Sequence, residues 1–75
     1  MIVRDLIERY SYLNQLETHV TLYLNDLDFG ELIKIMTVSV EKLLSASTYT
    51  EYRIAKVQIW WFDVTEDGYN IRIVI

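Results

Sequence analysis

The chain has 75 residues, of which 52% are hydrophobic, and it contains neither cysteine nor proline. A domain of this size buries only roughly 60% of the surface of its unfolded chain, and without cysteine it has no disulfide or thiolate-bound metal to support its core. The net charge of −4 and the scattering of the seven basic residues argue against the clustered basic surface that phosphate binding requires. We therefore expect one small domain over residues 1–75, with no direct nucleic-acid partner.

The apolar residues are spread through the chain in short runs. None of these runs approaches the ~18 consecutive residues that a membrane helix needs. The acidic Asp5 lies in the first few residues, where a secretory signal would be basic and then apolar. We expect a cytoplasmic protein that does not bind a membrane.

Residues 3–16 are predicted to form an amphipathic helix. Apolar side chains recur there at intervals of three and four, which places them on one stripe of a helix. These side chains belong to Val3, Leu6, Ile7, Tyr10, Leu13 and Leu16. Asp5 near the start and Arg9 further along also suit the helix dipole.

Residues 18–25 alternate between apolar and polar side chains, as a half-buried strand does. Val20, Leu22 and Leu24 would share one face. The stretch from Asn25 to Gly30 then ends the strand, because its short polar residues and glycine favour a turn.

Residues 29–47 are consistent with two structures. Apolar residues fall on a single helical stripe from Phe29 to Leu44, and Asp28 with Glu31 could form a capping box, which favours a long helix. The many β-branched residues favour instead a strand over 31–38. In that second structure a short helix follows, capped by Ser39 and running through Leu44.

The last third of the chain is predicted to be a β-hairpin. One strand covers residues 51–64, the next covers residues 69–75, and Thr65–Gly68 form the turn. An Asp-Gly pair is a strong signal for such a turn because both residues tolerate a positive φ. Together these elements predict an α+β domain: an antiparallel sheet of three or four strands, packed by the N-terminal helix.

Three large aromatic residues stand side by side in the first strand of this hairpin. Successive side chains on a strand point to opposite faces, so Trp61 would lie on one face with Trp60 and Phe62 on the other. A chain this short rarely covers both faces with its own atoms, so either a helix or a partner must cover the second face. We predict a protein-binding patch on Trp60 and Phe62, with a polar rim of acids. The acids of the rim are Asp63, Glu66 and Asp67.

The motifs of enzymes and metal sites fail on inspection. His19 is the single histidine, and no cysteine or suitably placed serine accompanies it as a nucleophile. Asp26, Asp28 and Gly30 resemble part of a calcium loop, but the register puts Leu27 at a ligand position and Met36 in place of the required glutamate. We therefore predict no catalytic residue, no metal site and no cofactor.

The opening Val3–Arg9 (VRDLIER), followed by Leu13, Leu16 and the strand His19–Leu24, resembles a class of small bacteriophage-encoded proteins. Those proteins begin with a Val-x-Asp-Leu-Ile-Glu helix, pass through a short turn into a strand and finish as a small sheet. This chain lacks the proline or Asp-Ala common in that turn. The class includes anti-CRISPR and other anti-defence inhibitors that cover a host protein's surface, which implies location in the host cytoplasm.

We therefore expect a non-enzymatic protein-binding module, encoded by a phage or mobile element, that inhibits or modulates a host protein by surface occlusion. The alternative is a self-associating structural protein, a homodimer formed through a sheet face or a strand edge. The resemblance carries no functional residue to this chain, because the class has no functional motif.

Overall fold

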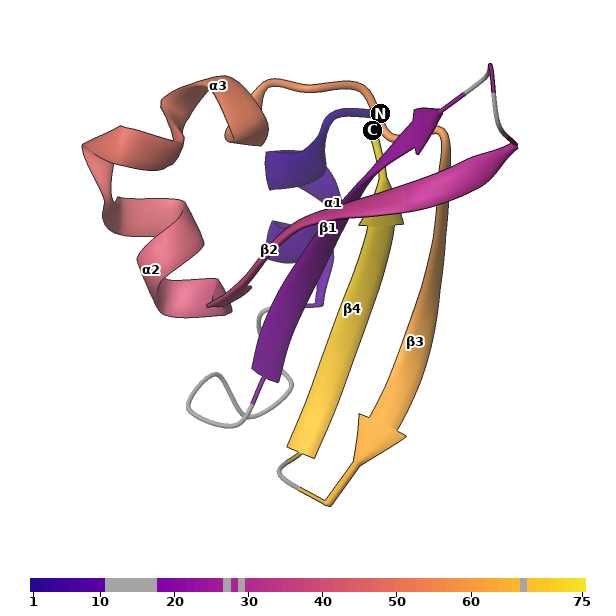
Figure 1. Ribbon diagram of the computed structural model, residues 1–75. Helices are drawn as coiled ribbons and strands as arrows, with labels where there is room; N and C mark the ends of the chain where they lie inside the picture. Colours follow the sequence, from indigo (N-terminus) through magenta and orange to yellow (C-terminus); the bar gives the residue numbers. More distant parts are fainter. Residues whose placement is uncertain (11–17, 27, 29, 67) are drawn as a thin grey trace.

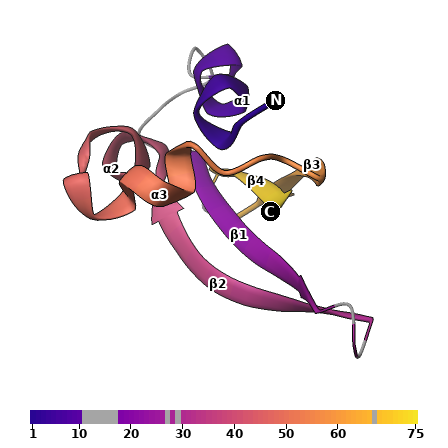
Figure 2. The ribbon, with the colours of Figure 1, turned by 90° about the horizontal axis from the view of Figure 1, so that it is seen from above.

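The computed structural model describes residues 1–10, 18–26, 28, 30–66 and 68–75. Four strands form one sheet in the order β2-β1-β4-β3, and the helices lie on one side of it (Figures 1 and 2). This arrangement confirms the predicted α+β fold. The elements are α1 (Val3–Arg9), β1 (Thr18–Asp26), β2 (Glu31–Ser39), α2 (Val40–Ser45), η2 (Ser47–Tyr49), α3 (Thr50–Arg53), β3 (Ile59–Thr65) and β4 (Gly68–Val74).

The sheet is mixed rather than wholly antiparallel. The pairs β1–β2 and β3–β4 are antiparallel, as expected for hairpins, whereas β1 pairs with β4 in parallel. The parallel pair joins residues that are about fifty positions apart, with Thr18 opposite Tyr69 and Tyr23 opposite Val74. Because β4 lies between two neighbours, the free edges of the sheet belong to β2 and β3.

The helix α1 uses the predicted apolar stripe to cover the sheet. Val3, Leu6 and Ile7 are all fully buried, and Asp5 and Arg9 lie in the first and last turns. No side chain caps its start; instead the Val3 N–H donates to the carbonyl of Ala55 at 2.9 Å. The helix is confirmed over residues 3–9, and its predicted continuation over residues 11–16 lies outside the described part of the chain.

Residues 31–45 adopt the strand and short helix, so the long-helix alternative is wrong. Ser39 is the N-cap of α2, with its Oγ accepting from the Lys42 N–H at 3.2 Å. The capping box between Asp28 and Glu31 does not form, because Glu31 begins β2. Gly30 turns the chain with a φ of 64°, and its N–H donates to the Asp26 carbonyl at 2.8 Å. Pairing with β1 gives this β-branched stretch a hydrogen-bonding partner, and a helix here would leave that side of β1 without its neighbour.

The strand predicted over residues 51–64 begins only at Ile59, and residues 50–53 form the short helix α3 instead. The Arg53 guanidinium explains this difference, because its Nη1 donates to the carbonyls of Leu43 at 2.8 Å and Ala46 at 2.7 Å. These contacts fix the segment against the end of α2 and satisfy carbonyls that the helix end leaves open. The hairpin that follows is confirmed, with β3 and β4 paired antiparallel up to Thr65 opposite Gly68, and with Gly68 at a φ of 125°.

The core lies between the sheet and the helices. It is built from α1, α2 and the inward faces of β1, β2 and β4, with Leu22, Leu43 and Ile71 fully buried. Chains of this size depend on a single contiguous core. None of the described helices lies on the other face of the sheet (Figure 2), and the side chains of that face form the candidate site.

Candidate binding surface on the open sheet face

The register of β3 and β4 places the two tryptophans on opposite faces. Trp60 lies opposite Ile73, which is buried in the core, and Trp61 lies opposite Arg72. Directly opposed residues point to the same face of a sheet. Trp60 and Phe62 therefore point toward the helices, and Trp61 points to the open face, as the alternation predicted.

The face of β3 that carries Trp60 and Phe62 is covered by the chain itself. Both rings are half-buried and pack against the core. Tyr10, at the end of α1, contacts both rings, with its centroid 5.2 Å from that of Trp60 and 5.5 Å from that of Phe62. The predicted anchor thus lies at the margin of the core, and its role in partner binding stays a prediction. The exposed indole of β3 is that of Trp61.

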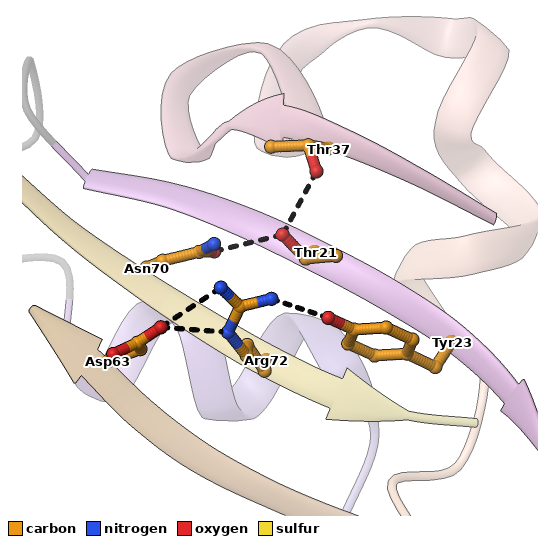
Figure 3. A network of polar contacts seen from close by, with 6 residues as sticks. All are labelled: Thr21, Tyr23, Thr37, Asp63, Asn70 and Arg72. Carbon is orange, nitrogen blue, oxygen red and sulfur yellow. Dashed lines mark hydrogen bonds and ion pairs between the residues drawn. The ribbon is translucent and has the colours of Figure 1, made fainter. Parts of the chain in front are cut away.

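Trp61 is 38% exposed and stacks on Tyr23 across the intervening strand β4. The two ring centroids are 5.9 Å apart and the planes differ by 16°. The Tyr23 hydroxyl in turn accepts a hydrogen bond from Arg72 Nη1 (Figure 3). The indole is therefore held at a fixed place on the open face although one side of it is exposed to solvent.

Arg72 joins the strands on either side of it. Its Nε and Nη2 donate to Asp63 Oδ2 at 3.1 and 2.9 Å, while Nη1 reaches Tyr23 (Figure 3). The hydrogen bond to Asp63 raises the pKa of Arg72, and the one to Tyr23 adds to the effect. An ion pair this exposed to water contributes little to stability. Its main consequence is that one acid of the predicted rim is already neutralised by the chain's own arginine.

A second group of hydrogen bonds centres on Thr21, which is only 1% exposed. Thr21 Oγ1 donates to Asn70 Oδ1 at 3.1 Å and lies 3.0 Å from Thr37 Oγ1. Because a threonine has one hydroxyl proton, Thr37 must be the donor in its own contact with Thr21. With Arg72 and Asp63, these contacts cross all four strands on one face (Figure 3).

Two strongly exposed apolar side chains lie on β3. Ile59, 63% exposed at the start of the strand, shares the open face with Trp61, whereas Val64, 73% exposed near its end, shares the opposite face with Trp60. Of the predicted rim, Asp63 lies on the open face and Glu66 is exposed in the turn. Asp67 lies outside the described residues.

Other kinds of site have little support in the described residues. No three side chains of the metal-binding types come together in that part of the chain, and His19 lies singly on β1, half-buried. None of the helices there is long and apolar enough to cross a membrane.

The fold and surface define a small α+β protein with helices on one side of a mixed sheet and an aromatic and polar face on the other. Comparisons with protein-family models, characterised proteins and solved structures give no match for this chain.

No motif in the sequence assigns Tyr23, Arg72, Thr21 or Asn70 to a site. The alternation along β1 and β4 already placed each of them on the polar side of its strand. The missing information was that β1 and β4 are neighbours, because only that pairing brings Tyr23 to Arg72 and Thr21 to Asn70.

Proposed function

We propose that this chain is a non-enzymatic protein-binding module that docks through the open face of its sheet. The observation that supports this best is the Trp61 indole, which is exposed although it is held in place by Tyr23. Tryptophan, tyrosine and arginine are the residue types that contribute most binding energy at protein interfaces. All three occur here within one network.

The geometry favours binding without rearrangement of the face. Trp61 and Ile59 supply apolar anchors, and Asp63, Arg72 and Glu66 supply polar groups around them. Ordering a free side chain at an interface costs about 0.5–1.5 kcal/mol. Because the hydrogen bonds of Arg72 and the stack on Tyr23 already order Trp61, Arg72 and Asp63, most of that cost is absent for these three side chains.

We further propose that the partner is a host protein and that the chain is an accessory protein of a phage or mobile element. Its effect on the partner would be steric, since a bound module covers the surface beneath it. Such a mechanism needs no catalytic group. The resemblance of residues 3–24 to small phage proteins supports this proposal.

Affinity capture from bacterial lysate tests the proposal. We expect the tagged chain to retain one protein at near-stoichiometric yield and the Trp61→Ala variant to lose it. Ile54→Ala is the matched control, because Ile54 is a large apolar residue, 58% exposed, that lies outside the strands. Quantitative mass spectrometry gives the yields. Capture of no specific protein, or equal capture by Trp61→Ala, contradicts the proposal.

A further inference from the structure

The two free edges of the sheet differ in their protection against other strands. The edge strand β2 has a bulge, because Leu22 lies opposite Met36 and Tyr23 opposite Lys34, which leaves Ile35 without an opposite residue. Its exposed half also carries Glu31 and Lys34. A bulge and charged side chains, lysine above all, are the devices by which natural edge strands avoid pairing with a second chain.

The edge strand β3 lacks these devices. Its register with β4 is regular from Ile59 opposite Val74 to Thr65 opposite Gly68, without a bulge. Its one charged residue, Asp63, is neutralised by Arg72 on the strand behind it. Ile59 and Val64 are nevertheless among the most exposed apolar residues of the described chain. An edge that is regular, neutral and apolar is the kind that pairs with another strand.

We propose that β3 pairs antiparallel with β3 of a second copy, so that two sheets join into one of eight strands. The charges at the two ends of β3 favour a second copy of this chain as the partner strand. Exposed Lys56 precedes β3 and exposed Glu66 follows it, so the strand has a basic end and an acidic end. Antiparallel pairing brings Glu66 of one copy close to Lys56 of the other, twice, and such a self-complementary patch is what a two-fold dimer requires.

The apolar residues fit the same arrangement. With the two-fold axis at Phe62, Val64 of one copy lies opposite Trp60 of the other, and both point to the helix-covered side. The exposed Val64 is then covered by a ring that is itself half-buried. The axis is perpendicular to the sheet, so the two open faces lie on the same side and carry two Trp61 side chains. The dimer thereby goes beyond the proposed function, since it doubles the docking face.

The contact between the two copies is small. Seven residues of β3 span about 24 Å at ~3.4 Å per residue. The shortest extent of the molecule is 20 Å. A strip of these dimensions covers roughly 500 Å² on each copy, or about 1,000 Å² in total, which is near the lower bound for specific interfaces. We therefore expect a reversible dimer and not a permanent one.

Sedimentation velocity on the purified chain tests this pairing. Over about 1 to 500 μM, the range suited to a contact of this size, we expect a concentration-dependent monomer–dimer equilibrium. Val64→Lys should remove the dimer. Leu32→Lys, on the exposed part of β2 where Leu32 is 48% exposed, is the matched control and should leave it unchanged. Far-UV circular dichroism confirms that both variants fold.

A charge exchange tests the orientation. Lys56→Glu alone should raise the dimer dissociation constant about tenfold, equivalent to about 1.4 kcal/mol. Adding Glu66→Lys in the same chain should restore it. A wild-type chain that stays monomeric, a dimer lost in Leu32→Lys but kept in Val64→Lys, or a failure of the exchanged chain to recover overturns the proposal. These measurements involve no partner protein, so their failure leaves the capture experiment to stand separately.

Discussion

Replacing Trp60 and Trp61 by alanine, one at a time, compares the two faces of β3 with the same chemical change. Trp60 packs against the core and contacts Tyr10 at 5.2 Å between ring centroids. Truncating a fully buried aromatic residue costs about 3–5 kcal/mol, and Trp60 is only half-buried. We therefore expect Trp60→Ala to lower the free energy of unfolding by about 2–3 kcal/mol, below the range for full burial.

Trp61 is more exposed, and the ring contact that holds it is the stack on Tyr23. An aromatic pair of this kind contributes about 0.5–1.5 kcal/mol. We therefore expect Trp61→Ala to lower the free energy of unfolding by about 1 kcal/mol, with partner capture lost in the same variant.

Urea unfolding followed by far-UV circular dichroism measures both values at one low protein concentration. A change of 1 kcal/mol shifts the thermal midpoint of a domain this small by about 4–8 °C, so Trp60→Ala should lower it by roughly 10–20 °C and Trp61→Ala by about 5 °C. A domain of this length has about 4–11 kcal/mol in total, so both variants remain folded at room temperature. If Trp61→Ala destabilises the protein as much as Trp60→Ala, the open face is part of a core and our interpretation of it is wrong.

Three further changes test single contacts, each measured by its urea midpoint. Thr21→Val keeps the shape of a buried side chain but removes the hydroxyl that bonds Asn70 and Thr37. It should lower the free energy of unfolding by about 1 kcal/mol. An unchanged midpoint would show that these bonds add nothing in solution. Arg53→Met removes the donors to two carbonyls around the end of α2 and should lower the free energy of unfolding by about 1–2 kcal/mol. An unchanged midpoint would mean that water replaces these hydrogen bonds equally well. Gly30→Ala should cost about 1 kcal/mol from backbone strain alone. An added Cβ there meets nothing within 4 Å, so a much larger loss would contradict the positive φ as the cause.

Local patterns in the sequence determined the elements whose signals agree. The apolar stripe placed α1, the alternation of residues 18–25 placed β1, and Asp-Gly with its flanking apolar residues placed the β3–β4 turn. The alternation also separated Trp60 from Trp61 onto opposite faces before any fold was known. These features depend on neighbours within a few residues, and so the sequence carries them directly.

The tertiary structure decided whatever depends on distant pairing. Residues 31–39 are a strand because β1 offers them a hydrogen-bonding edge, and residues 50–53 are helical where Arg53 bonds the end of α2. The helices cover the Trp60 face and leave the Trp61 face open, a choice that periodicity alone does not make. The open-face network exists because β1 and β4 are parallel neighbours, and a contact between residues about fifty positions apart leaves no periodic trace in the chain.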